Sequence, residues 1–413
     1  MKNYILTALF CLISISVFSQ TPTDKIFYDK QWKVTTIKDS IAFYRILKKE
    51  NDKYIVNDYY QSGILQMNGT CSSLNPDIRE GVFIYYHENG QISGQGEYVK
   101  DKKEGKWKMY DYEGKISREG IYIQGNEEGK WTWYFPKGNV INREGEFRNG
   151  KKEGKWIWYF PNGKVDSEGE YRNDKKEGKW IIYKYEGQMS AEGSYIQDNK
   201  EGKWIWYFPN GKISSEGELH NGKREGKFQI YSKDGTLEGE GFYFHDKKNG
   251  IWNTFYPDGN IRSIQNFKEN KLNGDLTTYY PSKVIKRTDK YLNDTLISGK
   301  CFSVFGQDTT YFPYEQKASF KGGLSELKEF LNETIKYPEQ ARTRNIQGRV
   351  IVRFAVDKTG QVMDAEIKHS IDPLLDKEAL RVVSKMPLWN CGLIDGIPAE
   401  TTFALPVVFK IEQ

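Results

Sequence analysis

The side chains best suited to acid–base or metal chemistry in this 413-residue sequence are its four histidines. They are His87, His220, His245 and His369. They are scattered at no spacing typical of a ligand set, and no Cys-x-x-Cys pair accompanies them, as many zinc sites would require. A Ser-His-Asp triad is recognised by its geometry, but nothing in the sequence singles out a serine. We therefore expect no enzyme activity, no catalytic residue, no metal site and no cofactor.

Glutamates recur through the middle of the chain and are the next residues that chemistry could use. The row consists of Glu104, Glu128, Glu153, Glu177, Glu201 and Glu225. Carboxylates are the ligands that calcium prefers. Lysines stand close to each of these glutamates, however, so the two signs of charge alternate. We therefore interpret the Lys-Lys-Glu-Gly-Lys segments as solvated turns, and not as a calcium site or a charged binding stripe.

Tryptophans follow the same interval as the glutamates. Segments of the type Glu-Gly-Lys-Trp end at Trp107, Trp131, Trp156, Trp180 and Trp204, which lie 24 or 25 residues apart. Exposed aromatic patches usually mark contacts, and on that reading the rings line a groove for a glycan, a lipid or a protein partner. The interpretation that we favour is that these rings form the core of a thin sheet.

The elements that must position these residues are β-hairpins. In each repeat an aromatic residue follows three positions after the tryptophan, a turn often ending in Asn-Gly or Asp-Gly comes next, and a second apolar run closes the unit. Asn-Gly and Asp-Gly between short apolar runs indicate hairpins, because glycine adopts positive φ without steric cost. A lone hairpin of this size cannot bury its aromatic side chains, so the units must stack.

This pattern resembles the MORN family of repeats, in the variant seen in YwqK-like, antitoxin-type proteins. We predict nine units over residues 81–300, preceded by a β-rich N-terminal cap at residues 20–80 and followed by a linker at residues 301–312. The predicted fold is mainly β: an elongated, single-layer antiparallel hairpin array, followed by a small α+β domain at residues 313–413.

The first nineteen residues are predicted to be a signal peptide. Lys2 precedes an apolar run over residues 4–18, and Val17 and Ser19 stand where a signal peptidase would cut, before Gln20. This run is shorter than the roughly 20 residues that a membrane-spanning helix needs. We therefore expect export to the periplasm. The alternative is an uncleaved segment that anchors the chain in the inner membrane.

Two further properties limit the partners and covalent links of the exported chain. The net charge of +5 is weak for this length, so nucleic acid is not an expected partner. After removal of the signal peptide three cysteines remain, Cys71, Cys301 and Cys391, and an odd number does not complete a disulfide framework.

The period ends near residue 313, and seven short motifs follow in the order of the TonB C-terminal domain. They are Phe320-Lys321-Gly322-Gly323, Tyr337-Pro338, Gly348-Arg349-Val350, Asp376 with Ala379-Leu380-Arg381, Met386-Pro387-Leu388-Trp389, Gly396-Ile397-Pro398 and Leu405-Pro406-Val407-Val408-Phe409. The family-motif positions among them are Tyr337, Pro338, Gly348, Asp376, Arg381, Pro387 and Trp389. The region resembles the Bacteroidetes-type energy transducers of the TonB family.

This resemblance implies a three-stranded antiparallel sheet whose last strand meets the TonB box, a short extended segment of an outer-membrane TonB-dependent receptor. The partner would add a strand to an open edge, so main-chain hydrogen bonds would supply affinity. The implied partner-binding residues are Thr402, Phe403, Ala404, Leu405, Val407, Val408 and Phe409. Pro406 fits an edge strand independently, because proline lacks an N–H donor.

The sequence also departs from a complete transducer. It has no histidine before His87 and no proline-rich spacer, and the hairpin array stands where that spacer would be. We therefore expect a periplasmic adaptor in support of transmembrane transport, with the array as spacer or interaction scaffold. The alternative is a non-transport envelope scaffold, or a repeat protein that binds cell-wall glycan, lipid or other envelope proteins.

Overall fold

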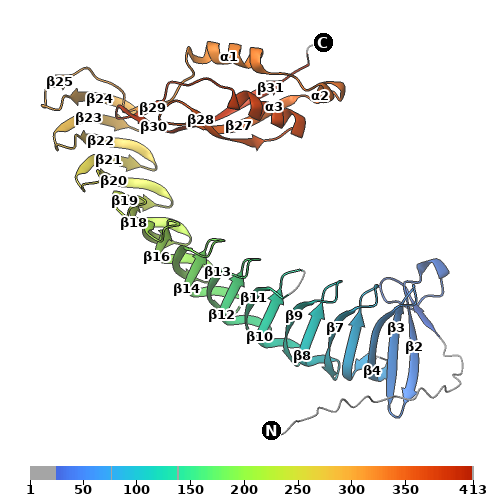
Figure 1. Ribbon diagram of the computed structural model, residues 1–413. Helices are drawn as coiled ribbons and strands as arrows, with labels where there is room; N and C mark the ends of the chain where they lie inside the picture. Colours follow the sequence, from blue (N-terminus) through green and yellow to red (C-terminus); the bar gives the residue numbers. More distant parts are fainter. Residues whose placement is uncertain (1–24, 76, 137–138, 412–413) are drawn as a thin grey trace, which may run out of the picture. The chain divides into compact units, whose positions relative to one another are not determined.

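Figure 1 shows the computed structural model of the chain. The structure describes residues 25–75, 77–136 and 139–411, so the predicted signal peptide lies outside the described residues. The chain divides into two compact units, one ending at Asn249 and the other running from Gly250 to Gln413, and each is described by itself below.

The first unit opens with an antiparallel meander. Its elements are β1 (Ile26–Tyr28), the 3-10 helix η1 (Lys38–Ser40), β2 (Phe43–Glu50), β3 (Lys53–Tyr60), β4 (Leu65–Leu74), β5 (Asp77–Arg79) and β6 (Gly81–Tyr86). Arg45 and Asp58 of this meander are buried, and the Arg45 Nε lies 2.7 Å from the Asp58 Oδ1. The Arg45 Nη1 also lies 2.6 Å from the Oδ2 of the exposed Asp77. Each charge is paired, as burial requires.

Hairpins of nearly constant length follow. They comprise β7 (Ile92–Val99), β8 (Lys102–Tyr110), β9 (Ile116–Ile123), β10 (Asn126–Tyr134), β11 (Ile141–Arg148), β12 (Lys151–Tyr159), β13 (Val165–Arg172), β14 (Lys175–Tyr183), β15 (Met189–Ile196), β16 (Asn199–Tyr207), β17 (Ile213–His220), β18 (Lys223–Tyr231) and β19 (Leu237–Phe244). Neighbouring strands pair antiparallel, and the connecting Asn173-Asp174 turn has φ values of 51° and 68°. Two residues of positive φ are typical of the tight turns that match the twist of a hairpin.

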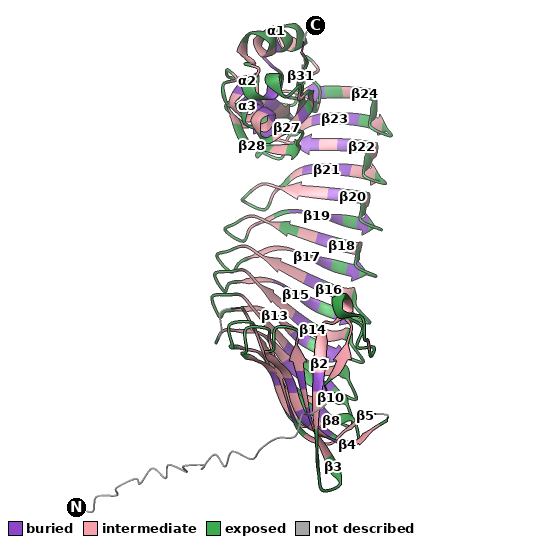
Figure 2. Cartoon of the chain, turned by 90° about the vertical axis from the view of Figure 1, so that its right-hand side faces the viewer, coloured by how far each residue is buried: buried purple, intermediate pink, exposed green. Residues whose placement is uncertain are grey.

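In five of the hairpins one buried tryptophan packs on a glycine of the preceding strand. Gly169 of β13 pairs with Trp180 of β14, and a Cβ built at Gly169 would lie 2.3 Å from the indole Cδ2. The indole Nε1 donates a hydrogen bond of 3.2 Å to the Glu170 carbonyl. The glycine therefore fixes the position of the ring, and the carbonyl satisfies its N–H. Equivalent glycine–aromatic pairs are Gly96–Trp107, Gly120–Trp131, Gly145–Trp156, Gly193–Trp204 and Gly217–Phe228. Figure 2 shows that the buried residues recur along the hairpins.

The opposite face of the sheet carries a ladder of polar contacts, because side chains alternate between faces along a strand. Glu168 accepts a hydrogen bond of 2.9 Å from the Tyr183 hydroxyl and lies 2.7 Å from the Lys155 Nζ. Burial and the Glu168 carboxylate raise the pKa of Tyr183 to about 12. The same arrangement recurs at Lys130–Glu144–Tyr159, Lys179–Glu192–Tyr207 and Lys203–Glu216–Tyr231.

The second unit begins within a hairpin and ends in an α+β region. Its strands and helices are β20 (Lys247–Phe255), β21 (Ile261–Lys268), β22 (Lys271–Tyr279), β23 (Ile285–Leu292), β24 (Thr295–Phe302), β25 (Asp308–Thr309), β26 (Glu315–Gln316), α1 (Gly323–Thr334), α2 (Glu339–Thr343), β27 (Gly348–Val356), β28 (Val362–His369), α3 (Pro373–Ser384), β29 (Gly392–Ile394), β30 (Ile397–Ala399) and β31 (Thr401–Phe409). Two small sheets complete the unit, in the orders β28-β27-β31 and β26-β29-β30.

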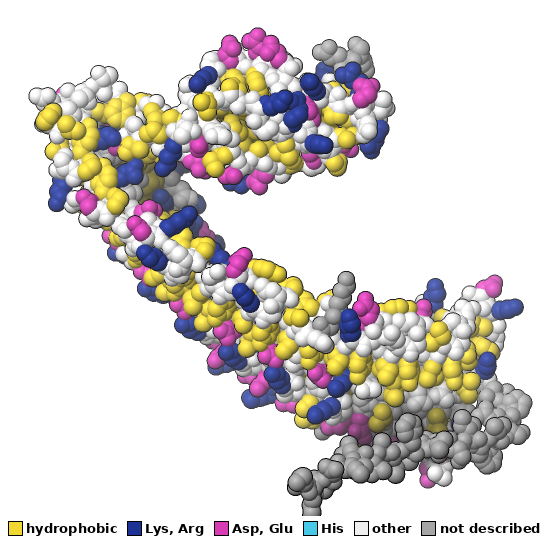
Figure 3. Space-filling view, viewed as in Figure 1, with side chains coloured by type: hydrophobic (Ala, Val, Ile, Leu, Met, Phe, Trp, Pro, Cys, Tyr) yellow, Lys and Arg dark blue, Asp and Glu magenta, His cyan; other side chains and the backbone are white. Residues whose placement is uncertain are grey.

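The predicted fold class is confirmed. The hairpins form a long antiparallel sheet of one layer, and a small α+β region follows them. The aromatic side chains are also placed as expected for a core, because Trp131, Trp156 and Trp204 are fully buried. On the face drawn in Figure 3, hydrophobic side chains follow the hairpins, and charged side chains of both signs line the margin.

The requirement for a glycine beneath the Trp180 ring can be tested by adding one methyl group at that glycine. In the Gly169→Ala variant the new Cβ meets the Trp180 ring, so we expect the array to lose about 1–3 kcal/mol of unfolding free energy, as overpacked cores do. The measurement is urea unfolding of the full chain followed by tryptophan fluorescence.

The matched control is Gly94→Ala, because Gly94 also lies in a strand, but its added Cβ meets the flexible Met109 sulfur at 3.3 Å and the Lys108 carbonyl at an ordinary 3.7 Å. Equal midpoints for the two variants would show that the indole does not need a glycine beneath it.

Candidate functional site

The C-terminal sheet is built around β27. Val350, Val352, Phe354 and Val356 alternate along this strand and are all buried in one core cluster. α3 contributes to the same cluster, and it begins after Asp372, whose Oδ1 accepts a hydrogen bond of 2.9 Å from the Leu374 N–H. Asp at the cap and Pro in the first turn are the usual signals of a helix start. This core holds β27 rigid and leaves the outer strands of the sheet as its two margins.

β31 forms one of these margins. It pairs with β27 in continuous register from Gly348↔Phe409 to Val356↔Thr401. Among residues 25–75, 77–136 and 139–411, β27 is the one strand that pairs with β31, so the other side of its backbone has no strand partner there. An antiparallel strand with one neighbour presents unpaired N–H and C=O groups along its free side.

The predicted partner-binding residues divide between the two faces of β31. Val407 and Phe409 are buried in the core, and Phe403 and Leu405 are half-buried on the same face. The opposite face is exposed and carries Thr402, Ala404, Pro406 and Val408. The structure therefore brings these residues together on one strand, but a partner on the free side would meet backbone first and the alternate side chains second.

β28 forms the opposite margin and has a different chemistry. It carries Asp364, Glu366 and Lys368, all exposed, and its register with β27 shifts at two places. Charged side chains and irregular register discourage an added strand. β31 has no charged residue between Thr401 and Phe409, and its pairing shows no shift. Of the two margins of this sheet, β31 is the one suited to accept a strand.

Two hollows border β31. An apolar cavity of about 240 Å³ lies between α1 and the middle of the strand, with Leu324, Leu327, Trp389, Phe403 and Leu405 in its lining. A more polar one of about 420 Å³ lies between β26, β29 and the start of the strand. Such cavities are places where alternate side chains of an extended segment find room.

The family-motif positions hold the domain together and do not form the free margin. The Tyr337 hydroxyl donates a hydrogen bond of 2.5 Å to the Ile346 carbonyl, and its ring meets Phe409 edge-on at 5.8 Å. Trp389 is 5% exposed and packs against Phe320, Phe354 and Phe403. The remaining positions act locally: Pro338 precedes α2, Gly348 begins β27 against Ile371, Asp376 accepts from Ser370, and Pro387 is exposed in a loop.

Arg381 joins α3 to the end of α1. Its guanidinium donates two hydrogen bonds, of 2.7 and 2.6 Å, to the Glu378 carboxylate and one of 2.6 Å to the Thr334 carbonyl. Burial acts to raise the pKa of Glu378, but hydrogen bonds from Arg381 and from the Lys336 N–H outweigh burial and lower it. The pair therefore fixes the helix that borders the apolar cavity.

The glutamates that recur through the repeats have structural roles here. The Glu153 carboxylate accepts a hydrogen bond of 3.0 Å from the Asn173 N–H of the next turn, and the rest of the glutamate row does the same at Gln124, Asn149, Gln197, Asn221 and His245. Within the described ranges no group of three or more His, Cys, Asp or Glu side chains could hold a metal ion. No helix in this part of the chain is long and apolar enough to cross a membrane.

A cluster of buried charges at Arg287, Asp289 and Asp395 was not predicted from the sequence. The signal was present in the repeat pattern, because Asp289 stands where other units have the glycine that seats the aromatic ring. The small sheet formed by β26, β29 and β30 was also missed, since three-residue strands carry too little pattern to detect.

Comparison with known proteins identifies both parts of the chain. Residues 333–411 match the family described as Gram-negative bacterial TonB protein C-terminal. Seven segments match the family described as MORN repeat variant: 79–100, 103–124, 127–149, 152–173, 200–221, 224–245 and 248–269. The predicted resemblance to both families is therefore confirmed. No curated protein matches the sequence.

Two solved structures show a distant similarity to the chain. A crystal structure of TcdB2-TccC3 has a TM-score of 0.15 and 13% identity, covering 67% of this chain and 20% of that one. A Photorhabdus luminescens Tc holotoxin pore has a TM-score of 0.14 and 13% identity, covering 63% of this chain and 16% of that one. The match spans a fifth or less of those chains, and scores this low carry no inference about function.

Removal of Arg381 should loosen α3. In the Arg381→Ala variant the Glu378 carboxylate, which is 9% exposed, loses its charged partner, so we expect a loss of about 1–3 kcal/mol. The measurement is hydrogen exchange of the α3 amides in the full chain. Because the folded pKa of Glu378 is lowered, the stabilisation is present above the ordinary Glu pKa of about 4.3 and disappears as the pH falls through the folded value.

Arg353→Ala is the matched control, because the Arg353–Glu366 pair of 3.1 Å is more than half exposed on both sides. Its loss should cost less than about 1 kcal/mol. Equal effects of the two variants would argue against a fixing role for Arg381.

Proposed function

The chain carries MORN-type repeats followed by a TonB C-terminal domain, and from that premise we propose that it is a TonB-like protein that binds outer-membrane TonB-dependent receptors by β-strand addition. The TonB family match indicates an envelope protein, and we place it in the periplasm, in support of transmembrane transport. The two matched families are non-catalytic, which supports a role in binding.

The observation that carries this proposal is the free side of β31. Strand addition needs an unpaired main-chain ladder, a regular register and freedom from charged side chains. β31 meets these requirements along Thr401–Phe409, whereas β28 has three charged residues and two register shifts. An extended receptor segment would thus lie antiparallel or parallel to β31 and continue the sheet.

The affinity of such an edge for an added segment and its selectivity among segments would have different sources. Main-chain hydrogen bonds hold any extended segment, whereas cavities beside the strand discriminate among its alternate side chains. The apolar cavity next to Phe403 and Leu405 would take an apolar side chain. Fixing α1 through Thr334 and Arg381 keeps this cavity open before the partner arrives, which lowers the ordering cost of binding.

The repeats would act as a spacer or scaffold in this proposal. Trp133, Trp158 and Trp206 are half-buried, whereas Trp107, Trp156 and Trp204 are at most 2% exposed and lie against glycines of the neighbouring strands. Rings in that position stabilise the sheet and leave little area for a ligand. The array therefore supplies length and an attachment for the C-terminal domain.

Disulfide trapping can test the proposed edge. We place a cysteine at the exposed Ala404 of β31 in a full-length Cys391→Ser background, since Cys71 and Cys301 are buried. Peptides from the N-terminal boxes of TonB-dependent receptors carry one cysteine at successive positions. We expect trapping at every second peptide position, because side chains on one face of a strand recur with period two.

The matched control is a cysteine at the exposed Glu366 of β28, which should trap at least tenfold less peptide. Equal trapping at the two margins, or no periodicity at Ala404 in a folded chain, would contradict strand addition at β31.

A further inference from the structure

The pairing pattern that the earlier repeats share changes in the last complete hairpin, which is formed by β23 and β24. In earlier units a glycine of one strand pairs with an aromatic residue of the next, as Gly217 does with Phe228. In β23 and β24 the order is reversed, because Asp289 pairs with Gly299. A Cβ built at Gly299 would lie 2.4 Å from the Asp289 Oδ1 and 2.5 Å from the Tyr311 ring. Asp289 and Tyr311 therefore occupy the space that an indole fills elsewhere.

Arg287 brings a positive charge to the same place. It is fully buried, and its Nε lies 3.1 Å from the Asp289 Oδ2. Its guanidinium also donates to the Phe312 carbonyl and lies 4.7 Å from the centre of the Phe312 ring. A buried guanidinium is stable only where charge and hydrogen-bond partners surround it, so the segment after β24 is required to complete this environment.

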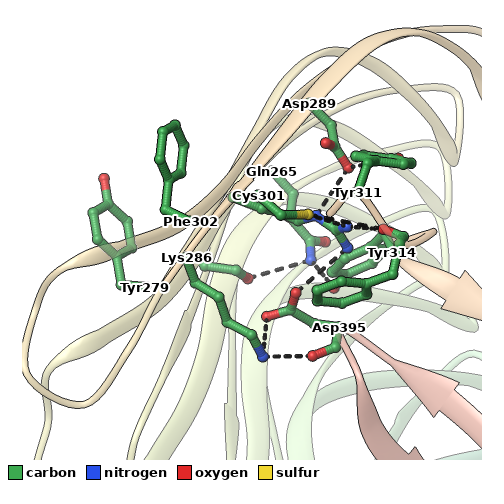
Figure 4. A network of polar contacts seen from close by, with 12 residues as sticks. Gln265, Tyr279, Lys286, Asp289, Cys301, Phe302, Tyr311, Tyr314 and Asp395 are labelled. Carbon is green, nitrogen blue, oxygen red and sulfur yellow. Dashed lines mark hydrogen bonds and ion pairs between the residues drawn. The ribbon is translucent and has the colours of Figure 1, made fainter. Parts of the chain in front are cut away.

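The C-terminal region supplies the second carboxylate. The Asp395 Oδ1 lies 3.4 Å from the Arg287 Nη1, and its Oδ2 lies 3.2 Å from the Lys286 Nζ. The Lys286 Nζ also donates a hydrogen bond of 2.5 Å to the Asp395 carbonyl. Figure 4 shows these contacts converging between the hairpin and the Asp395 loop. The charges of the two cations, Lys286 and Arg287, are balanced by those of two carboxylates, Asp289 and Asp395. All four residues belong to the unit that begins at Gly250.

Asp395 stands at the tip of a short hairpin. β29 and β30 pair from Gly392↔Ala399 to Ile394↔Ile397, and Asp395 and Gly396 form the turn with φ values of 52° and 73°. β30 ends at Ala399, and β31 begins at Thr401. The residue that contacts the array is thus joined to the proposed binding strand by one short strand.

We infer that Asp395 is a docking residue that locks the C-terminal domain to the last hairpins of the array through Arg287 and Lys286. A load on β31 then reaches the array through β30 and the Asp395 cluster, which includes the Phe312 carbonyl, in addition to the covalent connection through residues 303–314. This device does not depend on which receptor binds, or on whether one binds at all.

Hydrogen exchange of the full chain tests the lock from both of its sides. In Asp395→Ala the amides of residues 311–316 and 392–399 should exchange at least tenfold faster, whereas those of β27 and α3 stay unchanged. Lys286→Ala, which alters only the array side, should accelerate exchange at residues 392–399 as well. The control is Asp364→Ala, an exposed carboxylate on β28 that should leave exchange in both segments unchanged.

The inference is overturned if Asp395→Ala leaves both segments protected, or if Lys286→Ala has no effect at residues 392–399. It is also overturned if Asp395→Ala accelerates exchange throughout β27 and α3, because Asp395 would then be a folding residue of the C-terminal domain.

Discussion

A sheet of a single layer has no second layer to cover its aromatic side chains, and the whole array depends on how this is solved. In five hairpins an indole lies on the glycine of the preceding strand, so the sheet itself buries these rings. The glycine has no Cβ to hold the ring away, and the indole N–H reaches a carbonyl on the same neighbour, as Trp180 does at Glu170. Because each unit's ring is buried by the unit before it, stability is shared between nearest neighbours, as in other repeat proteins.

The row of aromatic rings must end, and a cluster of charged side chains lies at each of its ends. Near the start, Arg45 pairs with Asp58 and Asp77 beside the buried Cys71, and near the finish, Arg287 pairs with Asp289 beside the buried Cys301. An aromatic at either place would lack a neighbour to cover it. A guanidinium paired with carboxylates fits in a smaller space than an indole, and it also accepts contacts from polar chain segments, as Arg287 does from the Phe312 carbonyl. The second cluster uses this property to hold Asp395.

The sequence predicted most of the fold because its signals are local and repeated. Glycine, tryptophan and turn residues at one interval determine the hairpins, and Asp372 with Pro373 determines the start of α3. The placement of β31 at a margin came from family resemblance, since one strand's pattern does not reveal its neighbours. The charge cluster joins residues more than one hundred positions apart, as in the contact of Arg287 with Asp395, and no local pattern links them.

The distribution of unpaired backbone explains why recognition is best assigned to the end of the chain. From β7 to β18 every strand has a partner on each side, so its main-chain groups are committed, and the tryptophans that lie on glycines are buried. An array built this way offers few unpaired backbone groups to bind another chain, however many repeats it contains. β31 combines a free ladder with an apolar cavity, and the Asp395 turn ties it to the array nearby. The repeats and the C-terminal domain are therefore complementary: the repeats pair nearly all of their strands with one another, and the C-terminal domain supplies one open edge.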